Sequence, residues 1–124
     1  MSIYKSCWLL IPAAALAVSQ TSYAGCDRAR GAEAFTKCSA CHSLQPGQHL
    51  MGPSLAKLRD RKAGGVEGYV FSMALRNSDV VWTEETLNRF IEDPQNTMRG
   101  TTMPFRGIKD PTERAALVCY LFEQ

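Results

Sequence analysis

The segment with the clearest chemical meaning is Cys38-Ser39-Ala40-Cys41-His42, in which an imidazole directly follows the second of two thiols. Thiols three positions apart on a helical turn can each add to one of the two vinyl groups on the same porphyrin edge. The thioethers then hold the ring and place His42 beneath the iron, for which neutral imidazole is a suitable ligand. This spacing is the attachment pattern of c-type haem. The sequence therefore predicts one covalent haem c, held by Cys38 and Cys41, with His42 as an axial iron ligand.

Two other uses of these residues stay open at this point. A thioredoxin-like thiol pair would have the same Cys-x-x-Cys spacing, but no strand–helix–strand pattern surrounds it and the adjacent histidine would have no role. Half of a zinc site is the other, but the remaining histidine is His49 and no second cysteine pair lies at zinc-finger spacing. The pattern favours haem. We expect His49 to be a surface or loop-tying side chain, with metal binding as its minor alternative.

The second axial position needs a ligand, and methionine sulfur can supply it. Most methionines fill cores, so the setting has to distinguish between them. Met103 precedes Pro104, which disfavours helical backbone at Met103, and Gly100 is typical of a loop. A loop this far downstream can wrap the opposite face of the porphyrin. We expect Met103 to be the second axial ligand, with Met98 as its rival.

Capping signals and apolar spacing predict helices. One is expected over residues 27–40, a second from its N-cap Thr83 to Pro94, and a third from Asp110 with Pro111 in its first turn. Long loops separate them, and such loops form a compact fold only when something large fills the middle. A porphyrin is such a filler. The prediction is an all-α fold of short helices and long loops wrapped around one covalent haem.

The first 24 residues have the layout of a cleaved secretory signal. Lys5 precedes an apolar run from Cys7 to Val18, and small residues lead up to Ala24. The run has 12 residues, whereas a membrane-spanning helix needs about 20. Cleavage would leave residues 25–124 as one haem domain without a transmembrane segment, in a periplasmic bacterial protein. A retained membrane anchor is the alternative.

Charge excludes one class of function. Without Lys5, 13 basic residues face 12 acidic ones, and the one dense basic cluster, residues 59–62, is interrupted by Asp60. Nucleic-acid binding would require a basic face or stripe. We therefore expect no nucleic-acid partner.

Beyond the haem motif, the whole chain after residue 24 resembles class I cytochromes c, which include mitochondrial cytochrome c and small soluble bacterial electron carriers. The resemblance covers Gly31, Phe35, Lys37, Gly52-Pro53-Ser54-Leu55, Arg61, Gly68-Tyr69 and Trp82 with its Thr-Glu-Glu-x-Leu continuation. The family fold implies that the N- and C-terminal helices cross at a glycine and an aromatic residue, here Gly31 and Tyr120.

The resemblance also implies roles for individual side chains. The carbonyl of Pro53 would accept the proton on the far nitrogen of His42, which fixes the tautomer and raises the basicity of that ligand. Arg61, Tyr69 and Trp82 would gather around the haem propionates.

The chain departs from the family at three positions. Phe71 and Phe90 stand where many members carry a tyrosine hydroxyl, and Arg99 stands where a proline is common. None of these changes removes a ligand. Loss of hydroxyl donors is expected to shift the reduction potential.

The ligand set determines the expected function. With His42 and Met103 on both axial positions, the iron has no open site for oxygen or peroxide, and it can only accept and release an electron. We expect a periplasmic, monomeric single-electron carrier between redox proteins, and not an enzyme. The alternative is a peroxidase-like haem enzyme or ligand sensor in which the Met103 ligand is labile or absent.

The resemblance places Lys37, Arg106 and Lys109 around the exposed haem edge, and ordinary solvated surface charge is the alternative interpretation of these residues. A positive face would suit a moderately acidic partner, since such encounters are steered by charge. The donor and acceptor would belong to the dehydrogenases, quinol-oxidising complexes, oxidases or photosynthetic centres.

Cys26 and Cys119 have three possible states. If the terminal helices cross as in the family, the two could form a disulfide, which needs Cα atoms about 4.4–6.8 Å apart. Alternatively, Ala24-Gly25-Cys26 resembles the end of a bacterial lipoprotein signal, although Tyr23 replaces the usual leucine, and Cys26 would then carry a lipid. Otherwise both are free thiols.

Overall fold

The computed structural model describes residues 25–124, so the signal sequence predicted for residues 1–24 lies outside the described residues. The described chain forms five helices, which are α1 (Arg28–Phe35), α2 (Met73–Arg76), α3 (Glu84–Glu92), α4 (Pro94–Thr97) and α5 (Pro111–Phe122). Within residues 25–124, extended backbone pairs only at an isolated antiparallel bridge between Lys62 and Val81. None of the helices in this range has the length and apolar character needed to cross a membrane. The fold is all-α, as predicted.

The main helices begin at side chains that cap their first amide groups. Asp27 caps α1, and Thr83 and Thr86 cap α3 through a reciprocal pair of hydrogen bonds. The carboxylate of Asp110 accepts a hydrogen bond from the amide of Glu113 at 2.7 Å and so begins α5. Side-chain acceptors at this position satisfy amides that would otherwise lack partners. The helix starts predicted at Thr83 and Asp110 are confirmed.

The first helix is shorter than predicted, because α1 ends at Phe35 rather than five residues later. The Thr36 amide and hydroxyl both donate to the Glu33 carbonyl, at 3.1 and 2.6 Å, which tightens the last turn. The amide of Cys38 then donates to the Phe35 carbonyl at 2.8 Å, and His42 donates to the Cys38 carbonyl at 2.9 Å. The haem-attachment segment is therefore a series of turns after α1. The sequence also did not predict α2 or α4, each of which has four residues.

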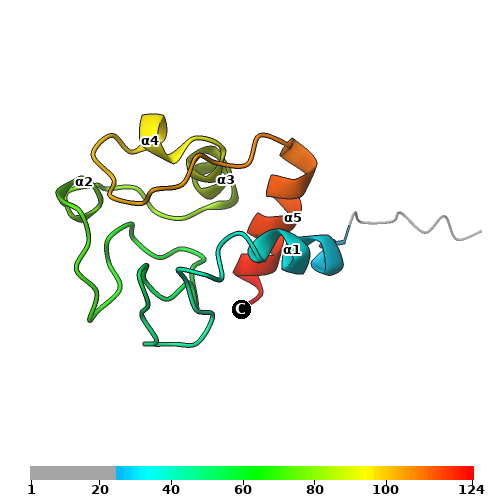
Figure 1. The fold of residues 1–124 in the computed structure, drawn as a ribbon, viewed down its shortest axis with the longest axis horizontal. Helices are drawn as coiled ribbons and strands as arrows, with labels where there is room; N and C mark the ends of the chain where they lie inside the picture. The colour runs from blue at the N-terminus through cyan, green and yellow to red at the C-terminus, as the bar shows by residue number, and fades with distance from the viewer. Residues whose placement is uncertain (1–24) are drawn as a thin grey trace, which may run out of the picture.

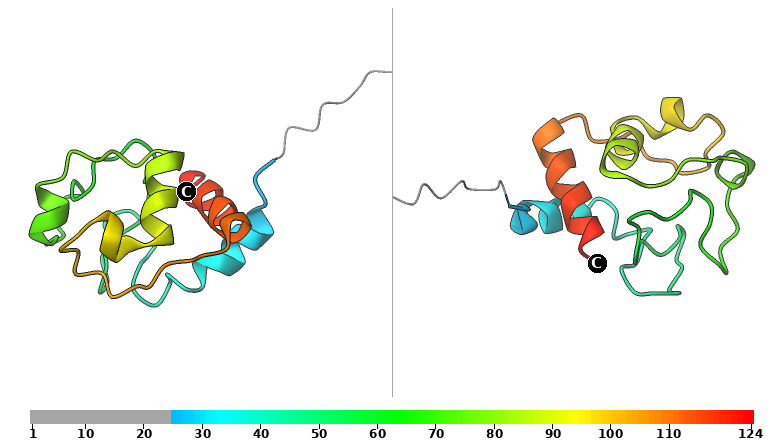
Figure 2. Two further views of the ribbon diagram at one scale, coloured as in Figure 1. Left: turned by 90° about the horizontal axis from the view of Figure 1, so that it is seen from above. Right: turned by 180° about the vertical axis from the view of Figure 1, so that it is seen from behind.

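The helices α1 and α5 cross at one end of the molecule, and the loops with α2 make up the other end (Figures 1 and 2). Gly31 allows the close approach, because a Cβ atom there would lie 2.4 Å from the Cβ of Tyr120 and 2.5 Å from the carbonyl oxygen of Ala116. The rings of Phe35 and Tyr120 lie 6.0 Å apart, and Leu117 is completely buried behind the crossing. The predicted crossing of Gly31 with Tyr120 is confirmed.

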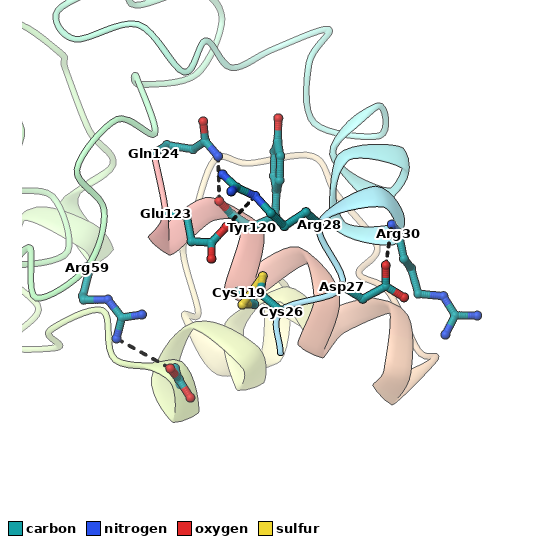
Figure 3. Close-up of a disulfide and its surroundings, with 10 residues drawn as sticks. Cys26, Asp27, Arg28, Arg30, Arg59, Cys119, Tyr120, Glu123 and Gln124 are labelled. Carbon is teal, nitrogen blue, oxygen red and sulfur yellow. Dashed lines mark hydrogen bonds and ion pairs between the residues drawn. A yellow bond between two sulfur atoms is a disulfide. The ribbon is translucent and has the colours of Figure 1, made fainter. Parts of the chain in front are cut away.

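A disulfide joins Cys26, just before α1, to Cys119 in α5 (Figure 3). Their Cα atoms lie 5.7 Å apart, within the range that a disulfide requires. Of the three states left open by the sequence, the structure has the disulfide. A disulfide-bonded Cys26 has no thiol to carry a lipid, so the lipid-anchor alternative does not fit this structure.

Candidate haem site

Cys38 and Cys41 lie on the turns that follow α1, half-buried, and neither is in a disulfide. Burial, followed by the neighbouring Cys41, raises the pKa of the Cys38 thiol to about 11. Catalytic thiols need a lowered pKa, because the thiolate is the reactive form. The raised pKa disfavours the reactive form at Cys38, and two adjacent thiols outside any disulfide are what attachment to two vinyl groups requires.

The ring of His42 is held by the backbone of the loop opposite it. Nδ1 of His42 lies 2.7 Å from the carbonyl oxygen of Pro53. Since a carbonyl can only accept, Nδ1 carries the proton and Nε2 keeps its lone pair. Burial lowers the pKa of His42, Arg61 lowers it further, and the Pro53 hydrogen bond partly opposes both. His42 is therefore a neutral imidazole with one nitrogen available for a metal.

Gly52 lies directly against this ring. A Cβ atom at Gly52 would be 2.4 Å from Cε1 of His42, so any side chain would displace the ring. The amide of Gly52 also donates to the carbonyl of Cys41 at 2.7 Å. The sequence did not indicate this supporting role, although the Gly-Pro pair to which Gly52 belongs is part of the family resemblance.

Arg61 and Trp82 come together through backbone pairing. The amide of Trp82 donates to the carbonyl of Arg61 at 2.9 Å, next to the Lys62–Val81 bridge. The Arg61 guanidinium donates to the carbonyls of Ala56 and Ser54, at 3.0 and 3.1 Å. Trp82 is buried. Arg61 thus fixes the course of the loop that contains Pro53.

Tyr69 lies on a separate loop. Its hydroxyl donates to the carbonyl of Met51 at 2.6 Å, and its ring meets Phe71 edge-on at 4.8 Å. The hydroxyl therefore holds the backbone one residue before Gly52. This partner was not anticipated from the sequence.

His49 ties two loops together, which is one of the two roles expected for it. Its Nε2 donates to the carbonyl of Glu67 at 2.9 Å, and its Nδ1 accepts from the amide of Ser54 at 3.0 Å. Both ring nitrogens are thus occupied by backbone groups. This arrangement braces the loop on which Pro53 meets His42.

The two candidate methionine ligands differ in their surroundings. Met98 is buried in the core at the end of α4, where its amide bonds to the carbonyl of Pro94. Met103 is half-buried on the extended segment that follows, and its amide donates to the Thr101 hydroxyl at 3.3 Å. The side chain of Gln95 donates to the Met103 carbonyl at 2.6 Å. Met98 packs in the core, whereas Met103 lies on a segment whose backbone is fixed by hydrogen bonds with Thr101 and Gln95.

The three basic residues expected around the haem edge are not equally available. Lys37 forms an ion pair with Glu113, and Lys109 donates to the carbonyl of Glu92 at 2.6 Å. Arg106 is exposed, and within residues 25–124 it has no ion pair.

These residues fit a covalently attached haem. Two thiols outside any disulfide precede a neutral imidazole, in which Nδ1 is hydrogen-bonded and Nε2 is free to bind a metal. Partly buried apolar side chains, including Leu44, Leu55, Leu75 and Phe105, pack against the buried core. A bound porphyrin would supply redox-active iron.

Comparisons with known proteins agree with this chemistry. The family model for cytochrome c matches residues 28–123. Cytochrome c2 of Blastochloris viridis is 39% identical over 107 residues, covering 86% of this chain and 84% of the relative. Cytochrome c2 of Rhodomicrobium vannielii is 34% identical over 121 residues, covering 97% of each. Cytochrome cH from Methylobacterium extorquens matches structurally with a TM-score of 0.74 at 37% identity, covering 79% of this chain and 99% of that chain. The chain therefore belongs to the cytochrome c family, whose members are electron carriers with covalently bound haem c.

Proposed function

We propose that this protein is a periplasmic, monomeric carrier of single electrons, with haem c attached at Cys38 and Cys41 and ligated by His42 and Met103. The observation that carries this proposal is the hydrogen bond between Nδ1 of His42 and the Pro53 carbonyl, at 2.7 Å. It leaves Nε2 as the only lone pair that the imidazole can offer to iron. The protein has no reaction of its own beyond electron transfer between a donor and an acceptor protein.

The chain's own residues keep the ligands still. Haem supplies the one-electron chemistry, and its efficiency depends on similar coordination in both oxidation states. The Pro53 carbonyl holds the proton at Nδ1, Gly52 admits the ring, and His49 braces the loop that contains both. A hydrogen bond to the nitrogen that does not bind the metal orients a histidine ligand and raises its basicity. In this proposal Arg61, Tyr69 and Trp82 lie around the propionates.

Export is supported by two independent features. Residues 1–24 have the composition of a secretory signal. The Cys26–Cys119 disulfide suits an oxidising compartment, because thiols in the cytosol are kept reduced. The cytochrome c2 relatives are bacterial, and a bacterial exported protein of this kind works in the periplasm.

Substitution of the two methionines tests the ligand set. Met103→Ala should remove the weak far-red ferric absorption of a sulfur–iron bond, give a high-spin spectrum and allow cyanide or carbon monoxide to bind. Met98→Ala is the matched control and should keep the far-red band while lowering stability, since Met98 is a core residue. If the native protein is already high-spin and binds these ligands, the peroxidase-like enzyme or sensor replaces the carrier.

Partner docking is expected to depend on Arg106 more than on Lys37. Lys37 is neutralised by Glu113, whereas Arg106 has no ion pair within the described chain. Arg106→Gln should slow electron transfer to an acidic redox partner at low salt and weaken its salt dependence, and Lys37→Gln should do so less. Stopped-flow rates across ionic strengths measure this. Rates that do not fall as salt rises would contradict a charge-steered encounter.

A further inference from the structure

The disulfide joins the first and the last of the four cysteines in residues 25–124. Cys26 and Cys119 are separated by 93 positions, and Cys38 and Cys41 lie between them in the sequence. Four cysteines allow three arrangements of two disulfides, together with single pairs. The observed pair is the one with the greatest sequence separation.

Chain statistics favour the other pairings in an unfolded chain. Cys26 is 12 positions from Cys38, and Cys38 is three from Cys41. Since the closure probability of a flexible loop falls as the 3/2 power of its length, Cys26 meets Cys38 about 20 times more often than it meets Cys119. If sequence proximity alone decided, Cys26 would therefore pair with Cys38 before it met Cys119.

Docking of α1 on α5 reverses this preference. Cys26 directly precedes α1, and its sulfur meets that of Cys119 on α5 (Figure 3). Beside the bond, Arg28 forms an ion pair with Glu123 at 2.9 Å. Farther along α1, Gly31 lies against the backbone of α5. The two thiols become neighbours only when this interface has formed.

The same interface continues into the haem-attachment turns. The ring of Phe35 contacts that of Tyr120, and Lys37 pairs with Glu113 at the start of α5. Cys38 follows directly. Fixing Cys38 therefore also fixes the end of α1 that rests on α5.

We propose that the Cys26–Cys119 disulfide closes last, after Cys38 and Cys41 have become thioethers, and that haem-directed docking of α1 on α5 selects this pair. This inference rests on the proposed haem attachment at Cys38 and Cys41. Each of these thiols adds its sulfur to one carbon of a vinyl group and its hydrogen to the other, with no net oxidation. Their sulfurs can then no longer form disulfides.

The final step is an oxidation. Cys26 and Cys119 form the S–S bond and lose two protons and two electrons. The acceptor is the disulfide of an oxidising thiol protein in the export compartment, which is reduced to a dithiol by exchange. Thiol–disulfide exchange of this type passes through a mixed disulfide with one of the two cysteines.

The first test removes the attachment thiols from the full-length exported protein. In Cys38→Ala/Cys41→Ala, thiols are trapped with an alkylating reagent and the linked fraction of Cys26 and Cys119 is measured by peptide mass spectrometry. We expect that fraction to fall at least fivefold relative to the haem-loaded protein, although the competing thiols are gone. Near-complete linkage in this variant would overturn the proposal. A covalent chromophore in it would instead contradict the haem site itself.

The second test follows the order of events in the unsubstituted protein, and so does not depend on a variant that folds. Pulse-labelled chains are alkylated at intervals and separated by mass. A haem-bearing species with two alkylated thiols should precede the haem-bearing disulfide. A haem-free chain with the Cys26–Cys119 bond as the precursor would overturn the proposal. Cys26→Ser/Cys119→Ser is the matched control and should take up haem to within twofold of the normal yield.

Discussion

The crossing of α1 with α5 and the loops over residues 42–72 are held together in different ways. At the crossing, contacts are apolar and close, with Gly31 against the α5 backbone, Leu117 fully buried and a disulfide across the edge. The loops contribute buried Leu58 and Ala63 to the core, but the part around Pro53 is held by side chains that hydrogen-bond to backbone groups, namely His49, Arg61 and Tyr69.

This difference separates stability from ligand placement. Regions with many buried apolar contacts open rarely, whereas regions held by a few polar contacts open locally. The crossing therefore sets how much free energy unfolding requires. The loop contacts set where the Pro53 carbonyl stands relative to His42. Substitutions at the crossing should lower the stability of the whole fold, and substitutions in the loops should loosen only the loops.

Loss of the disulfide should have the largest effect on stability. Cys26→Ser/Cys119→Ser releases a constraint over 93 positions, which is expected to lower the free energy of unfolding by about 4 kcal/mol. The visible spectrum of the folded protein should not change, because no haem contact is lost. Guanidinium unfolding followed by far-ultraviolet circular dichroism measures the free energy of unfolding, and absorbance measures the visible spectrum. A loss below about 1 kcal/mol would show that the crossing is stable without its covalent tie.

The second largest loss of stability is expected from a side chain at Gly31. In Gly31→Ala the new Cβ meets the carbonyl oxygen of Ala116, which is backbone and cannot move without shifting α5. Overpacking of this kind is expected to cost about 3 kcal/mol. Ala32→Ser, on the exposed side of the same helix, is the control and should be close to neutral. Equal stability of Gly31→Ala and the native protein would mean that the two helices are not in close contact in solution.

Sequence reasoning succeeded where the physics is local. The starts of α3 and α5 follow from Thr83 and Asp110, because an N-cap needs only the next three residues. It failed where distant contacts decide. The end of α1 depends on the turn that carries the haem thiols, and four-residue helices give too short a pattern to detect. The pairing of Cys26 with Cys119 depends on a Cα distance that only the fold determines.

The same distinction between local patterns and distant contacts applies to the candidate site. Cys38, Cys41 and His42 are recognisable because attachment chemistry demands a fixed spacing. The sequence predicted that His49 would lie at the surface or tie a loop, but its partners on Glu67 and Ser54 are backbone groups without a sequence signal. The hydrogen bond from Tyr69 to the Met51 carbonyl was missed for the same reason.

A smaller and local effect is expected from His49. In His49→Ala the amide of buried Ser54 and the carbonyl of Glu67 lose their partners, which should cost about 2 kcal/mol. Amide hydrogen exchange should quicken over residues 49–54 while α5 stays protected. Glu67→Ala is a matched control, because it keeps the carbonyl that His49 uses. Faster exchange throughout α5 would show that loop and crossing unfold as one unit.

The smallest effect should appear only in acid, at the cap of α5. The hydrogen bond from the Glu113 amide holds the pKa of Asp110 below its ordinary value. The unfolded chain therefore takes up this proton first, so the stability that Asp110 confers is complete above the ordinary carboxyl pKa of about 4 and is lost as pH falls through the folded-state value. Asp110→Asn keeps a capping acceptor that does not titrate and should lose less stability between about pH 4 and 2. Guanidinium midpoints across this range measure it, with Glu67→Gln as a control that removes an exposed carboxylate without touching a cap. An equal decline in Asp110→Asn and the native protein would show that another group causes the loss of stability in acid. The next group to substitute would be the capping carboxylate of Asp93, because a hydrogen bond from the Asn96 side chain also lowers its pKa.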